Sequence, residues 1–176
     1  GVGPIEPGEI FDGGSGSDAL YLSGVDVVLA DLDYSSIEAL ESEGGRYIAT
    51  LAELQQFDRI NATVVIMDGG SIDFTGKTAS GTFYLSDLGN QIDLRTQSGM
   101  ISVFGGGASD TIIGSELTDD PYENRLYGGG GDDYLVGSSS SSTDQLDGGT
   151  GTDILVGKAG NDHYYGDDQG DIICED

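Results

Sequence analysis

Aspartates recur at one fixed position of Gly-rich loops from Gly105 to the C-terminal end of the chain. The loops follow the pattern G-G-x-G-x-D-x-U-x, where U is apolar, and the period is nine residues without a gap over residues 148–174. Carboxylates together with exposed turn carbonyls can form a cage of about 6–8 hard oxygen ligands at about 2.3–2.6 Å, which suits Ca²⁺. Zn²⁺ would instead select His or thiolate ligands. The acidic position of successive repeats is occupied by Asp110, Asn124, Asp133, Asp144, Asp153, Asp162 and Asp171.

The same repeats predict the elements that hold these aspartates. Each repeat is long enough for a tight turn and one very short strand, whose single inward side chain is the U residue. Two repeats make one coil of a right-handed parallel β-roll, so the turns stack along two opposite edges. Glycine is required because stacked turns approach backbone to backbone and adopt φ > 0. The copy at 128–136 fits the pattern fully, the copy at 105–113 has Ala108 at the fourth position, and the copies at 114–127 and 137–147 contain insertions.

On these motifs the segment of about residues 105–176 resembles the RTX family, the hemolysin-type calcium-binding repeats of bacterial secreted toxins, proteases, lipases and epimerases. The stretch 160–175 is also similar to the block that often closes such an array. The resemblance implies a calcium β-roll. It further implies export of the unfolded chain by a type I system, followed by folding at the higher calcium concentration outside the cell.

The repeat register predicts which turns share an ion. One edge, called here the first edge, stacks turns 105–110, 128–133, 148–153 and 166–171. The second edge stacks the turn ending at Asn124, the Ser-rich turn ending at Asp144, and turn 157–162. We predict three or four Ca²⁺ in this segment, with the strongest site between 128–133 and 148–153. The Asp144–Asp162 site is weakened by Lys158 and the Ser run, and no ion is expected at Asn124. The predicted metal-site residues are Gly105, Gly107, Asp110, Gly128, Gly129, Gly130, Gly131, Asp133, Asp144, Gly148, Gly149, Thr150, Gly151, Asp153, Gly160, Asp162 and Asp171, with Asp18 as an additional candidate.

Charge narrows the classes of partner. The chain of 176 residues has 32 acidic against 6 basic side chains, a formal net charge of −26. Nucleic acid and anionic membranes are poor partners, because both need Lys and Arg, and a cation is the evident one. No apolar run approaches the length of about 18 residues needed to span a bilayer. The single Cys174 cannot form an internal disulfide. We expect a secreted, extracellular or cell-surface-associated monomeric module of a larger chain.

The first hundred residues predict less. Residues 1–10 are expected to be a linker or the edge of a processed segment, and residues 11–104 an irregular β-solenoid continuous with the C-terminal roll. Residues 13–21 repeat the pattern once, so Asp18 marks either one further ion site or a plain Gly-rich turn. Segments 20–32, 64–76 and 83–96 each read as two short strands around a turn, and 100–106 leads into the repeats. Segment 50–57 predicts a short helix that caps or flanks the open end, with a capping box between Thr50 and Glu53.

Catalytic interpretations find little support. The only His, His163, follows a repeat Asp at an outward position, and Cys174 has no basic neighbour in the sequence and is flanked by Glu175 and Asp176. Neither HExxH nor G-x-S-x-G is present, so we predict that this chain is not an enzyme. Two hypotheses remain: a calcium-dependent structural and secretion-folding module, or a calcium-dependent recognition module for a polysaccharide or cell surface. In the second, stacking platforms would come from Tyr127, Tyr134, Tyr164 and Tyr165.

Overall fold

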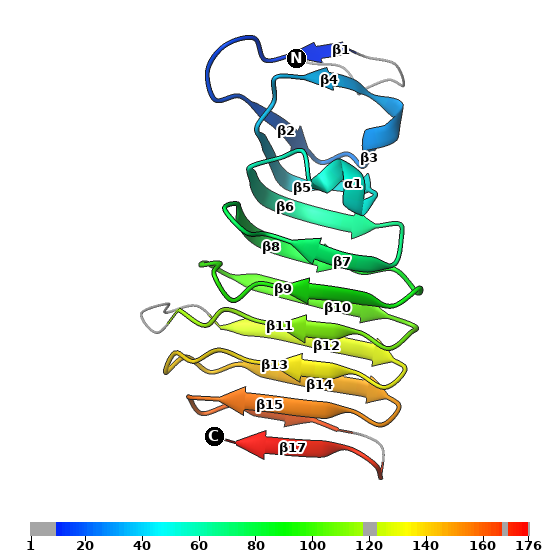
Figure 1. Cartoon of the computed structure of the whole chain (residues 1–176), viewed down its shortest axis with the longest axis vertical. Coiled ribbons are helices and arrows are strands. Elements are labelled where there is room, and N and C mark those ends of the chain that lie inside the picture. Colours follow the sequence, from blue (N-terminus) through cyan, green and yellow to red (C-terminus); the bar gives the residue numbers. More distant parts are fainter. Residues whose placement is uncertain (1–9, 118–122, 167–168, 176) are drawn as a thin grey trace.

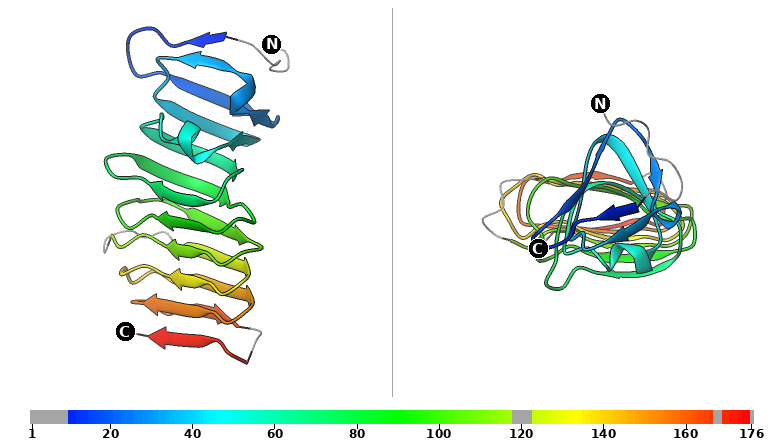
Figure 2. Two further views of the ribbon diagram at one scale, coloured as in Figure 1. Left: turned by 45° about the vertical axis from the view of Figure 1, so that its right-hand side comes forward. Right: turned by 90° about the horizontal axis from the view of Figure 1, so that it is seen from above.

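The computed structural model describes residues 10–117, 123–166 and 169–175, and within them the chain forms a β-solenoid (Figure 1). Of the expected linker, residues 1–9 lie outside the described part. Successive strands alternate between two long parallel sheets, so the chain winds in stacked coils. Seen from above, the green to orange coils superimpose, and the N-terminal segments project beyond them (Figure 2). The prediction of an all-β parallel solenoid is confirmed. No helix in the described part of the chain is long and apolar enough to cross a membrane.

The first sheet contains nine strands whose register runs the length of the molecule. In spatial order it holds β16 (His163–Tyr165), β14 (Gln145–Thr150), β12 (Asn124–Gly130), β10 (Ile101–Gly106), β8 (Thr78–Tyr84), β6 (Arg59–Ile66), β5 (Ala39–Ala49) and β2 (Ala19–Ser23), with β3 (Val27–Val28) also paired to β5. The second sheet holds β17 (Ile172–Glu175), β15 (Ile154–Lys158), β13 (Tyr134–Val136), β11 (Thr111–Ile113), β9 (Asn90–Asp93) and β7 (Gly70–Asp73). A separate pair, β1 (Ile10–Asp12) and β4 (Asp33–Ser35), lies at the N-terminal end.

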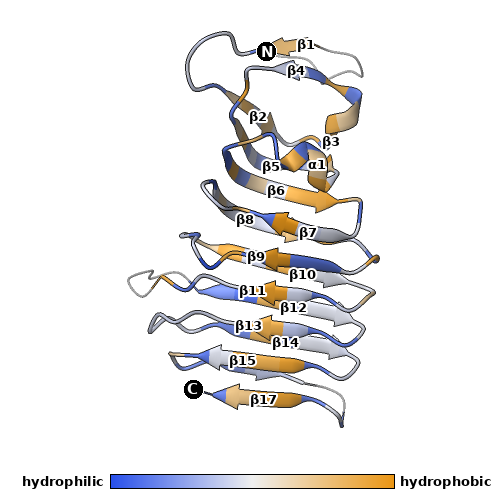
Figure 3. Ribbon diagram, viewed as in Figure 1, coloured by the Kyte–Doolittle hydropathy of each residue, from blue (hydrophilic) through white to orange (hydrophobic). Residues whose placement is uncertain are grey.

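One inward apolar side chain per repeat forms the core of the C-terminal coils. Leu126 pairs with Leu146 in the first sheet, and Leu135 pairs with Leu155 in the second, and all four are completely buried. Residues on either side of each inward position point outward, because successive side chains of a strand alternate between its faces. The apolar interior of these coils is therefore small. Figure 3 shows the Gly-rich β12 and β14 largely in pale colours, because glycine has intermediate hydropathy.

Larger side chains fill the N-terminal coils. Tyr47, Phe57 and Phe83 are fully buried there, and the Tyr47 hydroxyl donates to the Leu20 carbonyl at 2.5 Å. The predicted segments 20–32, 64–76 and 83–96 do contribute strands to these coils. The longest strand, β5, was not predicted, because its sequence ALESEGGRYIA breaks the apolar alternation where the register shifts between Glu41 and Arg46.

The predicted helix is present but short. It is α1 (Leu51–Leu54), and the capping box is confirmed: the Thr50 hydroxyl accepts from the Glu53 N–H at 3.3 Å, and the Glu53 carboxylate accepts from the Thr50 N–H at 2.7 Å. It connects β5 to β6 and contacts β7, so it flanks the side of the solenoid (Figure 1). A 3₁₀ turn, η1 (Leu29–Asp31), was not anticipated.

Candidate metal centre

The repeat turns stack along two edges in the predicted order. Turns of the first edge lead from the first sheet to the second, and the pairing of Gly106 with Gly129 and of Gly129 with Gly149 places one above another. Turns of the second edge lead back, and the α-carbon of Gly160 lies against the Ser142 carbonyl of the turn above. The parallel ladders on both sides thus bring the sixth-position residues of each edge into a column. Residues 167–168 of turn 166–171 lie outside the described part.

One carboxylate oxygen of each first-edge aspartate completes a hydrogen-bond ladder. The Oδ1 atom of Asp133 accepts the backbone N–H of Asp110 at 2.7 Å, and the Oδ1 atom of Asp153 accepts that of Asp133 at 2.8 Å. Asp171 continues the ladder to Asp153 at 3.0 Å. At its other end, Asp110 accepts the N–H of Asn90 at 2.6 Å. Each aspartate therefore caps the backbone of the coil before it, which holds its carboxyl group between two turns.

The second carboxylate oxygen is buried without a donor at two of these positions. Asp110 and Asp133 are 3% and 2% exposed, and within the described part of the chain their Oδ2 atoms have no hydrogen-bond partner. An ionised carboxylate in this setting is unfavourable unless an opposite charge or a donor meets it. Burial accordingly raises the pKa of Asp110 to about 6 and that of Asp133 to about 7, and the neighbouring carboxylates add to the rise. A bound cation would lower both pKa values, because it favours the ionised form of each carboxylate.

Carbonyl oxygens face the same spaces. A Cβ atom built on Gly105 would lie 2.6 Å from the Asp110 Oδ2 atom and 2.0 Å from the Gly128 carbonyl oxygen. A Cβ atom on Gly128 would lie 2.2 Å from the Asp133 Oδ2 atom and 2.5 Å from the Gly148 carbonyl oxygen. The first glycine of each turn thus leaves room for a carboxylate of its own turn and a carbonyl of the next. This donor set, all oxygen and without nitrogen or sulfur, fits Ca²⁺.

Glycine at the second repeat position is needed for the backbone. Gly129 has φ of 99°, and a Cβ there would lie 2.3 Å from the Gly106 carbonyl oxygen. Gly149 has φ of 79°, with the Gly129 carbonyl oxygen at 2.1 Å from its added Cβ. The remaining predicted glycines and threonine lie in or beside the same turns: Gly107, Gly130, Gly131, Gly148, Thr150, Gly151 and Gly160.

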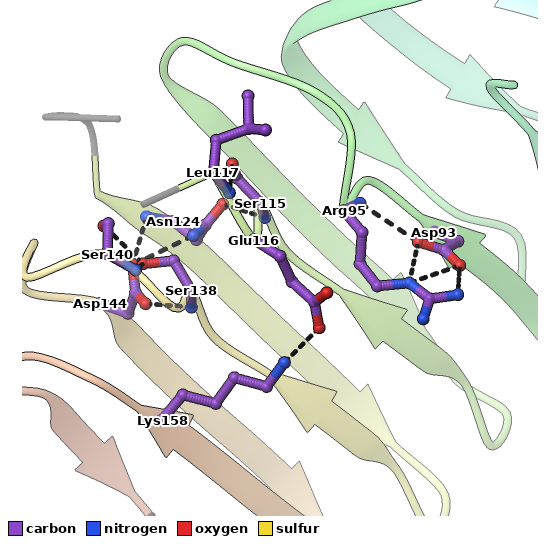
Figure 4. Close-up of polar contacts among 10 residues, drawn as sticks. All are labelled: Asp93, Arg95, Ser115, Glu116, Leu117, Asn124, Ser138, Ser140, Asp144 and Lys158. Carbon is purple, nitrogen blue, oxygen red and sulfur yellow. Dashed lines mark hydrogen bonds and ion pairs between the residues drawn. The ribbon is translucent and has the colours of Figure 1, made fainter. Parts of the chain in front are cut away.

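The second edge differs from the first (Figure 4). Both oxygens of Asp144 are hydrogen-bonded: Oδ1 accepts from the N–H and Nδ2 of Asn124 at 2.8 and 3.1 Å, and Oδ2 accepts from the Ser138 N–H at 2.5 Å. The Oδ1 atom of Asp162 accepts the Asp144 N–H at 2.9 Å. The Asp162 Oδ2 atom and the Tyr164 hydroxyl both lie beside Gly157, the first residue of turn 157–162, and not beside Asp144. Lys158 forms an ion pair with Glu116 across the Ser-rich turn.

Asp18 sits in a turn of the same design. Within the described residues its Oδ2 atom is buried without a hydrogen-bond partner, and a Cβ on Gly13 would lie 2.0 Å from the Ser36 carbonyl oxygen. The Asp18 N–H donates to Glu38 at 2.9 Å, as the first-edge N–H groups donate to the next aspartate. The neighbouring turn was not recognised from the sequence, because it contains no Gly-Asp motif. The sequence feature that could have identified this turn is Glu38. It directly precedes Ala39, which pairs with Ala19.

Comparison with known proteins agrees with these repeats. Residues 104–143 and 138–173 match the family model of the RTX calcium-binding nonapeptide repeat (4 copies). No curated protein and no solved structure matches the chain. Fold and turns together define a parallel β-solenoid whose stacked acidic turns suit calcium. Residues 104–173 therefore carry repeats of the RTX calcium-binding nonapeptide type, as the motifs predicted, and Ca²⁺ is the partner that such repeats imply.

Proposed function

We propose that this chain is a calcium-binding structural module of a secreted protein, which completes its folding on Ca²⁺ outside the cell. The observation that carries the proposal is the pair of buried Asp110 and Asp133 Oδ2 atoms, each beside a carbonyl oxygen of the next turn. A buried carboxylate oxygen without a donor is uncommon in folded proteins and calls for a bound partner. A cation between successive turns would meet both oxygens and tie the coils together.

Charge supports the same conclusion. Three or four bound Ca²⁺ would offset about six to eight of the 26 net negative charges. At low calcium the acidic turns repel one another, and at high calcium the bound ions stabilise the fold by mass action. We infer secretion and extracellular folding from the family, because RTX repeats are typically found in secreted proteins. In this role the module has no catalytic centre of its own.

The ion positions are part of the proposal. We place three ions on the first edge: between turns 105–110 and 128–133, between 128–133 and 148–153, and between 148–153 and 166–171. Asp18 would hold a further ion with the Ser36 carbonyl and Glu38, because this turn repeats the first-edge geometry. The fourth predicted ion of the C-terminal segment, at Asp144 and Asp162, is taken up below.

The alternative, a recognition module for polysaccharide or cell surface, is less well supported. Tyr127 does belong to a row on successive coils, with Phe104 at 4.6 Å and then Tyr84 at 4.8 Å between ring centroids. These rings are stacked nearly parallel, with interplanar angles of 2° and 11°, so they cover one another's faces. A sugar ring stacks on an open aromatic face, and the faces that these rings turn toward one another are not open. Tyr134 lies on the other sheet, and Tyr164 points toward the core.

Titration of Ca²⁺ into the chelator-treated chain, followed by far-UV circular dichroism, tests the proposal. The expected result is a gain of β signal with a midpoint between micromolar and millimolar Ca²⁺. Mg²⁺ is the control and should not reproduce it, because it prefers a tighter octahedral shell with retained waters. A chain that is already fully β and binds no calcium would contradict the proposal.

A further inference from the structure

The second residue of a repeat turn correlates with the state of its aspartate. In the first-edge turns 105–110 and 128–133 this residue is Gly106 and Gly129, with φ of 129° and 99°. The matching aspartates, Asp110 and Asp133, keep a buried Oδ2 atom that has no donor in the described residues.

Two turns outside the first edge obey the same relation. In the N-terminal turn the second residue is Gly14, with φ of 77°, and the Asp18 Oδ2 atom is buried without a donor among the described residues. In turn 157–162 the second residue is Lys158. It takes φ of 69° despite its side chain, and the Asp162 Oδ2 atom is likewise left without a donor in that part of the chain. The relation thus depends on backbone conformation rather than on glycine itself.

Serine at the second position gives the opposite result twice. Ser138 is not among the described residues with positive φ, and its N–H donates to the Asp144 Oδ2 atom at 2.5 Å. Ser115 shows the same feature, and its N–H donates to the Asn124 Oδ1 atom at 3.2 Å. In both turns the chain's own N–H takes the oxygen that first-edge turns leave for a cation.

We propose that the second residue of each turn decides whether its aspartate is left open to calcium, and that Ser138 closes the site at Asp144. The space between turns 137–144 and 157–162 then holds no ion. This inference rests on the proposed function, since it assigns the sites along which calcium binds. It removes the ion at Asp144 from the three or four predicted for the C-terminal segment and leaves the three of the first edge.

Other contacts hold the closed turn in place without metal. The Ser138 and Ser140 hydroxyls lie 2.8 Å apart, and the Ser142 hydroxyl lies 2.6 Å from that of Ser140. The Lys158–Glu116 ion pair reaches from the turn below to the turn above, and the Lys158 side chain is only 20% exposed. On this edge the Lys158 ammonium group therefore supplies the positive charge that we assign to a calcium ion on the first edge.

Counting calcium ions by native mass spectrometry tests the inference on the full chain. Asp133→Asn should lower the number of bound Ca²⁺ by at least one, whereas Asp144→Asn should leave it unchanged. Ser138→Gly should raise it by one, because its backbone can then adopt the left-handed conformation of the first-edge turns. Loss of an ion in Asp144→Asn, or no gain in Ser138→Gly, would overturn the inference.

A measurement on the unaltered chain covers the case in which Asp144→Asn does not fold. In the folded, metal-saturated chain, exchange of Ca²⁺ for Sr²⁺ should shift the ¹³C carboxyl resonance of Asp133 and leave that of Asp144 in place. A shift at Asp144 comparable to that at Asp133 would contradict the closed site. If calcium binds to neither the parent chain nor any variant, the proposed function fails instead, so the two failures are distinguishable.

Discussion

The N-terminal and C-terminal coils share one backbone architecture but have different interiors. Both are parallel ladders of the same two sheets, continuous from β7 to β17 and from β2 to β16. The coils before Asn90 enclose large apolar side chains such as Phe57 and Phe83, and the coils after it enclose one apolar residue per repeat and columns of aspartate. The same solenoid can therefore be stabilised by apolar burial in one half and by cations in the other.

The boundary between the halves lies at Asn90. Its N–H donates to Asp110, so it occupies the next place in the aspartate column, but it carries an amide in place of a carboxylate. Its Oδ1 atom accepts the Ser86 N–H at 3.1 Å, and its Nδ2 atom donates to the Asp68 carbonyl at 2.9 Å. A neutral side chain whose polar atoms are both hydrogen-bonded needs no cation. The column thus changes chemistry where the core becomes apolar.

Removal of calcium should separate the two halves most clearly. In the presence of a chelator, amides of β12 to β15 are expected to lose their protection from hydrogen exchange, because repulsion between buried aspartates outweighs the small apolar core. Amides of β6 and β8 should stay protected. Hydrogen exchange with mass spectrometry, with and without Ca²⁺, measures both regions at once. Equal loss of protection in both halves would show that they are not independent.

Truncation of the N-terminal core should act without regard to calcium. Phe83→Ala removes a fully buried ring and should lower the free energy of unfolding by about 3–5 kcal/mol. Urea denaturation of the N-terminal transition, measured with Ca²⁺ and with chelator, should give the same loss in both. A loss that added calcium restores would mean that this half also depends on the ion.

Substitution of one carboxylate should lower the stability of the calcium-loaded state. Asp133→Asn should remove about 2.7 kcal/mol of stabilisation when calcium is a hundredfold above its Kd. Asp132→Asn is the matched control, because Asp132 is exposed and its carboxylate caps the Thr152 N–H at 2.9 Å. Thermal unfolding at several calcium concentrations measures both variants. Equal effects of the two substitutions would argue that net charge, rather than a site, is responsible.

Acid should favour the metal-free C-terminal half. The pKa values of about 6 for Asp110 and about 7 for Asp133 lie above the ordinary value of 3.8, so these groups take up protons on folding. Their contribution to stability is present at low pH and is lost as pH rises through 6 to 7. The chelated chain should therefore unfold less readily at pH 5 than at pH 8. Calcium affinity should be lower at pH 5 than at pH 8, because protons compete with the ion for the same carboxylates. Denaturant unfolding at the two pH values is the check, and a flat response would place these carboxylates in water.

Much of the C-terminal half could be predicted from the sequence, because its contacts repeat at a fixed spacing. A nine-residue pattern determines both the turn and the strand, so stacking of Gly129 on Gly106 follows from register alone. The role of Ser138 could not be predicted, since it depends on which way one N–H points. The contact between Glu38 and Asp18 could not be predicted for a related reason, because the two residues lie 20 positions apart with no repeat between them.

The N-terminal half was harder to predict for another physical reason. Its longest strand, β5, spans the places of both β2 and β3 and carries an irregularity between Glu41 and Arg46. The buried Gln97, whose side-chain oxygen accepts the Ala79 N–H at 2.7 Å, belongs to no repeated motif. Apolar alternation indicates strands there, but only packing determines which side chains fill the interior.

Because the strands of each coil in the described residues pair only with those of the coils directly above and below it, the molecule should respond to a pulling force in steps. A coil in the repeat segment, such as the one between Leu126 and Leu146, contains 20 residues. Its release would lengthen the chain by roughly 66–72 Å, at about 3.3–3.6 Å per extended residue. In the C-terminal half the force of each step would be set by the calcium around it, and in the N-terminal half by apolar packing. The chain would behave as a tether with one adjustable and one fixed section.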